Sequence, residues 1–289
     1  MPPNQVSARI LTAAFFLFSL NGCVNLDDVA GLSKLSDEAR VALPKVSNDI
    51  GATCIRQNML LENTPAAERP ADLKALRCET YQELASHLAR DQNVLLDYFD
   101  ALGKLSSNRP LSYGAAIDSN TSALSTNTTL SASAIKAGTD AQNILKSLAD
   151  AGTRGYRERQ LGDLMKANDP AIQSLTQALK KIITDDYGVM LSNEESTVDS
   201  FYEGPMAAAQ PSERLALILV QRQYANDKTT LQSHKDEILL YAKLMDGLGT
   251  LHAKLTRQAM EKASPAEISK QAAPIIESLK VAISDLSTR

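Results

Sequence analysis

Three side chains in the first third of the chain have the types and spacing of a metal site. Glu83, His87 and Asp91 follow one another at intervals of four residues. On an α-helix this spacing places them on one face, where two carboxylates and an imidazole can share a divalent cation. The same spacing gives an ordinary solvated face with helix-stabilising pairs, and we favour that interpretation. We therefore predict no metal and no cofactor, and keep these residues as weak metal-site candidates.

Two further histidines, His234 and His252, lie on an apolar stripe. On one helix they are ~27 Å apart, so one metal ion cannot bind both. We predict that each packs as a neutral imidazole against a carbonyl or carboxylate. The acidic pairs 185–186 and 194–195 are adjacent, so their members diverge on a helix, and no zinc-protease, serine-hydrolase or phosphate-loop motif occurs in the sequence. We predict that the protein is not an enzyme and has no small-molecule substrate.

Cys54 and Cys78 flank a segment whose middle carries turn residues, from Asn63 to Pro70. Helical patterns lie on both sides, which predicts an antiparallel helical hairpin. The two cysteines are equidistant from residue 66, so they should lie at the same level of this hairpin. Their Cα atoms would then be within the ~7 Å that a disulfide spans. We predict a Cys54–Cys78 disulfide; two buried thiols that never pair are the alternative.

The elements that position these residues are predicted to be long helices. The sequence contains no Trp and 5 Phe, and it is rich in Ala, Leu, Ser and Thr, with few of the alternating patterns that strands need. Prolines, which are tolerated at the first position of a helix, divide the chain into segments. The expected helices span 26–42, 44–62, 70–106, 112–166, 170–203, 211–261 and 265–287.

Heptad periodicity predicts an all-α, elongated multi-helix bundle with long antiparallel, coiled-coil-like helices. Within 211–261, seam positions recur every seven residues from Leu217 to Ala259, with a second row three positions further on. The Ser/Thr-rich stretch 119–143 is either a linker or a helix; its apolar stripe favours a helix. The apolar run LALILV, 215–220, is too short to span a membrane, and we expect it to be buried in the bundle core.

The most hydrophobic run of the chain lies near its N-terminus. It spans 10–20, carries no charge and follows a segment with one basic side chain, Arg9. A membrane-spanning helix needs roughly 20 apolar residues, so this run is too short to be one. Its length and its position after a basic residue are typical of a secretory signal peptide. It ends in the sequence Leu20-Asn21-Gly22-Cys23.

With this ending the chain resembles the bacterial lipoproteins, whose signal peptides end in a Leu-x-Gly/Ala-Cys lipobox. The resemblance covers residues 1–23 only. It implies cleavage before Cys23, acylation of that cysteine and a lipid anchor that is held firmly by several acyl chains. Val24 stands where an Asp favours retention in the inner membrane, so the resemblance implies the outer membrane of a Gram-negative cell. An ordinary secretory signal or an uncleaved anchor is the alternative.

These expectations divide the chain into a signal peptide (1–22), a lipidated N-terminus with a tether or short helix (23–43) and a helical bundle domain (44–289). Loss of Arg9 with the signal changes the net charge from −4 to −5, and a mildly acidic chain is not typical of nucleic-acid binding.

We therefore expect a scaffold or interaction protein, anchored in the membrane by lipid and facing the periplasm, with a protein partner that the sequence does not identify. Two alternatives remain. One is a surface-exposed lipoprotein that binds a host molecule or excludes phage or plasmid entry. The other is a cell-wall-directed enzyme with a site assembled across helices.

Overall fold

The computed structural model describes residues 27–64, 77–107, 131–153, 161–261, 263 and 265–288. Within these ranges the chain is an all-α bundle without strands, which confirms the predicted fold class. The predicted signal peptide and Cys23 lie outside the described residues. The helices are α1 (Asp27–Asn63), α2 (Cys78–Ser106), α4 (Ala132–Thr153), α5 (Leu161–Lys181), α6 (Gly188–Ala208), α7 (Arg214–Met260) and α8 (Pro265–Thr288). A π-helical turn, η2 (Ile182–Tyr187), joins α5 to α6, and a 3₁₀ turn, η3 (Pro211–Glu213), precedes α7.

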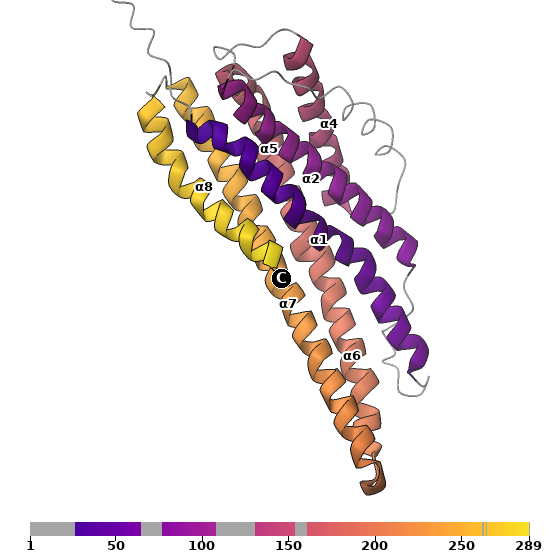
Figure 1. Cartoon of the computed structure of the whole chain (residues 1–289). Coiled ribbons are helices and arrows are strands. Elements are labelled where there is room, and N and C mark those ends of the chain that lie inside the picture. Colours follow the sequence, from indigo (N-terminus) through magenta and orange to yellow (C-terminus); the bar gives the residue numbers. More distant parts are fainter. Residues whose placement is uncertain are drawn as a thin grey trace, which may run out of the picture.

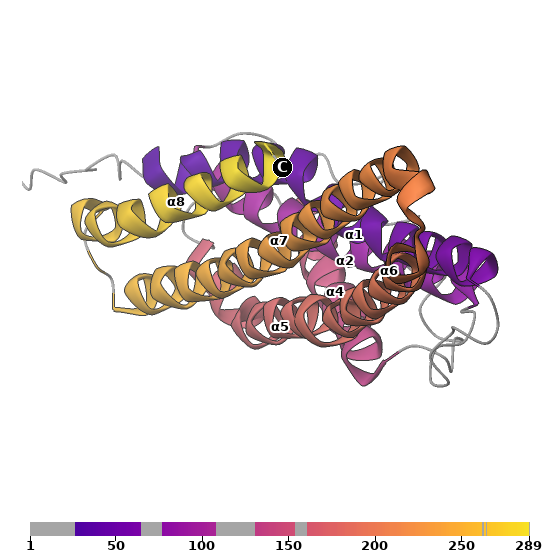
Figure 2. The ribbon, with the colours of Figure 1, turned by 90° about the horizontal axis from the view of Figure 1, so that it is seen from below.

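The helices lie side by side in an elongated bundle (Figure 1). α1 packs along α2, and α5, η2 and α6 form one rod that packs against α7. Seen from below, α7 lies between α8 on one side and the α5–α6 rod on the other (Figure 2). Beyond the end of α1, α6 and α7 continue together as a projecting hairpin (Figure 1). We call residues 199–226 of this hairpin the arm.

One hydrophobic core runs through the bundle, and every helix contributes to it. The largest side chains that are fully buried include Tyr98, Tyr187, Tyr241 and Phe99. The predicted seam of α7 faces this core over its C-terminal half, where Leu244, Met245, Leu248, Leu251 and Leu255 are all buried.

Two prolines that were predicted to begin helices lie inside helices instead. Pro44 lies inside α1 and Pro170 lies inside α5. A proline in a helix interior removes one backbone hydrogen bond and costs about 3 kcal/mol. The cost is offset here because the residues around Pro44 are anchored in the core, with Leu43 and Val46 buried. The segment 27–43 is therefore no separate tether; it forms the first half of α1 and carries core side chains.

Some of the other predicted helix boundaries are confirmed and some are not. A helical turn does begin at Pro211, and α8 begins at Pro265, as predicted. α2 begins at Cys78 rather than at residue 70, because Arg77 has an extended backbone with φ −86° and ψ 91°. Of the predicted helix 112–166, the structure describes α4 and the start of α5, whereas 108–130 and 154–160 lie outside the described residues.

The expectation that the run 215–220 is buried is also wrong. Leu215, Ile218 and Leu219 are 74 %, 51 % and 59 % exposed. The run lies in the arm, where α7 has α6 for a neighbour but extends past the ends of α1 and α8 (Figure 1). None of the described helices has the length and hydropathy needed to cross a membrane.

Candidate functional site

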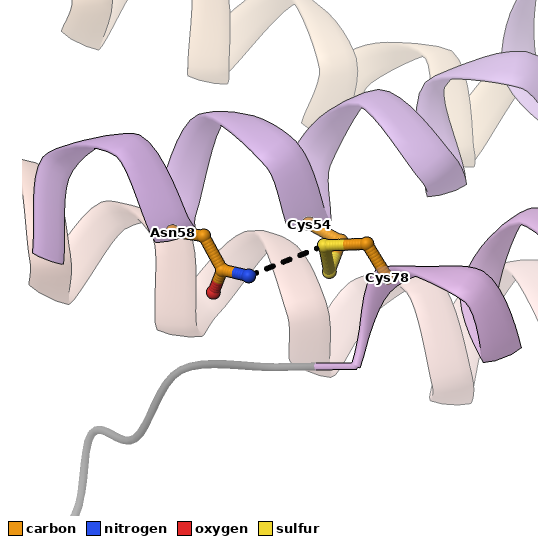
Figure 3. Close-up of a disulfide and its surroundings, with 3 residues drawn as sticks. All are labelled: Cys54, Asn58 and Cys78. Carbon is orange, nitrogen blue, oxygen red and sulfur yellow. Dashed lines mark hydrogen bonds between the residues drawn. A yellow bond between two sulfur atoms is a disulfide. The ribbon is translucent and has the colours of Figure 1, made fainter. Parts of the chain in front are cut away.

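A disulfide joins Cys54 of α1 to Cys78 of α2, as the sequence predicts (Figure 3). The Cα atoms are 5.6 Å apart, and Asn58 donates a hydrogen bond to the Cys78 sulfur at 3.3 Å. The predicted hairpin register differs in detail, because Cys78 is the first residue of its helix rather than a position well inside it. The disulfide ties α1 to α2 just before Arg56. Several polar contacts lie near Arg56.

These contacts form a polar cluster where the arm leaves the bundle. Arg56 and Asp49 of α1 are its centre: a side chain of α6 meets Arg56, and side chains of η2 and α7 meet Asp49. We call this set the junction cluster; its members are Asp49, Arg56, Tyr187, Glu194, His234 and Glu237. Residues from four elements, far apart in the sequence, therefore fix the base of the arm.

The Arg56 guanidinium binds two carboxylates at once. Its Nε donates to Glu194 at 2.6 Å, and its Nη1 donates to Asp49 at 2.7 Å. Glu194 is buried, and burial raises its pKa even though Arg56 opposes the shift. The pKa of Asp49 is lowered, because hydrogen bonds from Arg56 and Tyr187 outweigh its partial burial. Charge-assisted bonds of this kind are stronger than neutral ones, and here they join α1 to α6.

The π-helical turn η2 positions the tyrosine of this cluster. A π-helix has a wider turn than an α-helix, so it shifts the side chains that follow and is frequent at functional sites. Tyr187, the last residue of η2, is buried and donates its hydroxyl proton to Asp49. Burial and the Asp49 carboxylate raise the pKa of Tyr187 far above its ordinary value, so the hydroxyl stays protonated.

His234 completes the cluster from α7. Its Nδ1 is 3.2 Å from Glu237 and 3.6 Å from Asp49. Partial burial lowers its pKa, but the two carboxylates outweigh this and raise the pKa overall. Each acid of the cluster faces a donor or a cation, so the arrangement is a latch that joins the helices at this point.

A small cavity of about 210 Å³ opens beside this latch, between α1, α6 and α7. Its lining is mainly apolar, with Arg56 and Glu194 on one side. The remaining lining residues are Met59, Leu60, Val198, Asp227, Thr230 and Leu231.

A second polar group lies deep in the bundle. His252 Nδ1 is 2.8 Å from Asp169 Oδ1, and the Tyr98 hydroxyl is 2.7 Å from His252 Nε2. Carboxylate, imidazole and hydroxyl follow one another here as in a catalytic triad. However, Tyr98 and His252 are fully buried, and burial raises the pKa of the tyrosine and lowers that of the histidine. Tyr98 and His252 are therefore held in their neutral forms, Asp169 at the end of the chain is partly exposed, and His252 pairs with a carboxylate as predicted.

The predicted metal candidates do not converge. Glu83 is exposed, whereas His87 and Asp91 of the same helix are buried. Burial raises the pKa of Asp91 to about 7, and the nearby Asp140 of α4 adds to the shift. Among the described residues, no three His, Cys, Asp or Glu side chains are arranged to hold a metal ion.

Sequence reasoning missed the junction cluster. Arg56 and Glu194 are 138 positions apart, as are Asp49 and Tyr187, and no local pattern links them. One available signal was the predicted divergence of the pair 194–195. Glu194 does face Arg56, whereas Glu195 accepts from Lys228 and Lys235 on the other side of α6.

The arm carries the most exposed apolar surface of α7. Leu215, Ile218 and Leu219 lie at positions i, i+3 and i+4, so they form one stripe on the helix. Exposed arginines, Arg214 and Arg222, border this stripe at its two ends. We call these three apolar residues the arm stripe.

Comparison with protein-family models, curated proteins and solved structures gives no match for this chain.

Proposed function

We propose that this protein is a lipid-anchored interaction protein of the bacterial cell envelope, attached to the outer membrane and facing the periplasm. Its arm would bind a protein partner, and the molecule would carry out no catalysis. The observation that carries this proposal is the arm stripe, an apolar surface at the end of a projecting hairpin. Contiguous apolar side chains in solvent are typical of interaction sites.

The arm has its own internal contacts, so the stripe is not left exposed by poor packing. On the side facing α6, the ring of Tyr224 lies 5.5 Å from that of Tyr202, and its hydroxyl donates to Asp199 at 2.9 Å. Lys228 adds ion pairs to Glu195 at 2.8 Å and to Asp199 at 3.0 Å. α6 and α7 are thus held together through one face of α7, while the stripe occupies the opposite face.

The position of the stripe supports a protein partner rather than the anchoring membrane. α1 begins at Asp27, four residues after Cys23, a stretch of chain that spans at most about 14 Å. The start of α1 lies at one end of the molecule and the tip of the arm at the other (Figure 1). α7 alone, with 47 residues, is about 70 Å long. A lipid on Cys23 would therefore leave the arm pointing away from the bilayer.

The proposal is tested by removing the stripe. Leu215→Ser, Ile218→Ser and Leu219→Ser, combined in the full-length protein, should reduce crosslinked complexes in native membranes by about tenfold or more, because central apolar contacts dominate most interfaces. The matched control is Val41→Ser with Leu239→Ser, two side chains that are 68 % and 69 % exposed elsewhere on the surface. Complexes that survive the triple substitution, or that the control removes equally, would contradict the proposal.

The anchor is tested separately. Cells that express the protein in the presence of labelled palmitate should incorporate the label, and Cys23→Ser should abolish both this labelling and the matching cleavage. A wild-type protein that takes up no palmitate would show that the lipoprotein interpretation is wrong. Protease treatment of intact cells distinguishes the periplasmic orientation from surface exposure, since only a surface protein is degraded.

A further inference from the structure

We infer that the partner segment bound by the arm is an amphipathic α-helix whose apolar stripe is flanked by acidic side chains. The inference rests on the proposed function, because it specifies the partner of the same surface. It follows from two features of α7: the helical spacing of the exposed stripe, and the charges at its ends.

The arm stripe has the spacing of apolar side chains that are used for helix packing elsewhere in α7. Leu251 and Leu255 lie four residues apart, as Leu215 and Leu219 do, and both are buried in the bundle. The two halves of α7 therefore present similar apolar pairs, but only one pair is covered.

Near the buried pair, α7 is covered by another helix of the bundle. At Gly247, an added Cβ would come within 2.6 Å of Leu279 of α8, so the two helices approach closely there. α8 ends at Thr288, beside the middle of α7, and beyond that point α6 is the helix that continues along α7 into the arm (Figure 1). A surface that accepts a helix over one half is suited to accept one over the other, through the i, i+3, i+4 anchors typical of helix-in-groove recognition.

The charges at the ends of the stripe determine which charges a partner should carry. Arg214 and Arg222 are exposed, and neither forms an ion pair with any residue that the structure describes. The three acids of the arm lie on other faces. Asp199 accepts from Tyr224 and Lys228, and Glu213 accepts from the Gln210 backbone. Glu203 of α6 is exposed and lies near Tyr224, on the side of α7 that faces α6. Complementary potentials favour the correct partner and suppress the wrong ones, so the stripe favours a helix with acidic flanks.

The same charges disfavour a second copy of this chain as the occupant. Two arm stripes packed against each other in antiparallel fashion would place Arg214 of one copy near Arg222 of the other. Like charges facing each other across an interface cost free energy. A bilayer is disfavoured because α1, which follows the predicted anchor, begins at the opposite end of the molecule (Figure 1).

The experiment is photocrosslinking in cells from the full-length protein, with benzoyl-phenylalanine in place of Ile218. We expect the mapped adduct to be a segment of another protein, with apolar residues at helical spacing and at least two flanking Asp or Glu. Arg214→Glu with Arg222→Glu should lower the adduct yield about tenfold, since attraction becomes repulsion at both ends. Arg214→Gln with Arg222→Gln should give a smaller loss.

The matched control is Lys243→Glu with Arg257→Glu, two exposed cations of the same helix outside the arm. It carries the same change in net charge and should leave the yield unchanged. Exchanging the acids of the mapped segment for Lys should restore the adduct with the Arg214→Glu, Arg222→Glu protein.

The outcomes separate this inference from the proposed function. A protein adduct at Ile218 that neither pair of arginine substitutions weakens would leave docking intact and overturn the acidic helix. An adduct with a second copy of this chain, or with lipid alone, would overturn both. Absence of any adduct from a protein whose circular dichroism matches wild type would also overturn both.

Discussion

The two halves of α7 carry similar pairs of leucines in different surroundings. In the C-terminal half, Leu251 and Leu255 are buried in the bundle, whereas in the arm Leu215 and Leu219, at the same spacing, are exposed. The apolar pattern therefore indicates which side chains can be covered, and the lengths of the neighbouring helices decide whether they are. An extension of one helix pair beyond a bundle is enough to turn core residues into a binding surface.

Polar contacts differ between these regions as well. In the bundle, His252 and Tyr98 are fully buried, and each satisfies the other. At the base of the arm, the Lys228 pairs with Glu195 and Asp199 are about one third exposed, and exposed ion pairs add little stability. We therefore expect stability to reside in the bundle and the junction cluster, and binding to reside in the arm.

The largest effect is expected from the pair of leucines that defines this comparison. Leu255→Ala should lower the free energy of unfolding by about 3.5 kcal/mol, because it removes buried surface and leaves a cavity. Leu219→Ala should change it by less than about 0.5 kcal/mol, since an exposed side chain leaves no cavity. Urea denaturation followed by circular dichroism measures both, and equal effects would remove the distinction between the two halves.

A slightly smaller effect is expected at the base of the arm. Arg56→Met would leave Asp49 and Glu194 without their cation, and we expect a loss of about 3 kcal/mol, at the low end for a buried pair because Arg56 itself is partly exposed. Arg222→Met, in the arm, serves as the control and should cost less than about 0.5 kcal/mol. A cost below 1 kcal/mol for Arg56→Met would show that the junction cluster is no latch.

The third prediction concerns the hydrogen-bond chain of Tyr98, His252 and Asp169. Tyr98→Phe leaves His252 Nε2 buried without its donor, which should cost about 2 kcal/mol. Tyr224→Phe removes a hydroxyl from the half-exposed seam of the arm and should cost about 0.5 kcal/mol, because water can replace it at Asp199. Thermal denaturation of both variants measures the two losses of stability. A larger loss for Tyr224→Phe than for Tyr98→Phe would contradict the distinction between a buried bundle and a solvent-exposed arm.

Local sequence patterns predicted features that depend on nearby residues. The all-α class, the turn at Pro211 and the pairing of His252 with a carboxylate followed from periodicity, capping and the cost of burying an unpaired polar group. The pattern could not reveal that α1 continues through Pro44, because core packing on both sides offsets the lost hydrogen bond. It placed the run 215–220 in the core because periodicity carries no information on how far α1 and α8 extend.

The junction cluster could not be predicted from local sequence patterns either. Arg56 meets Glu194 only once α1 lies beside α6, and Tyr187 reaches Asp49 through a π-helical turn that no local pattern announces. The disulfide was correctly predicted although α2 starts later than expected. The predicted turn limited the possible partners of Cys54 to a cysteine close to it in the sequence. No local pattern limited the possible partners of Arg56 in the same way.

The smallest effect, and the sharpest contrast, is expected in the pH dependence of the two histidines. Asp49 and Glu237 raise the pKa of His234 against the effects of burial and Arg56, so its contribution is full below its unfolded pKa, near 6.5, and is lost as pH rises through the folded value. Burial lowers the pKa of His252 despite Asp169, so its contribution to stability is full above that unfolded pKa and is lost as pH falls through the folded value.

His234→Gln should therefore destabilise the protein more at pH 5 than at pH 8, and His252→Gln more at pH 8 than at pH 5. Urea denaturation of each variant and of the wild type at pH 5 and pH 8 measures these losses of stability. If the loss changes with pH in the same direction for both variants, the two histidines do not differ in the way that their surroundings require.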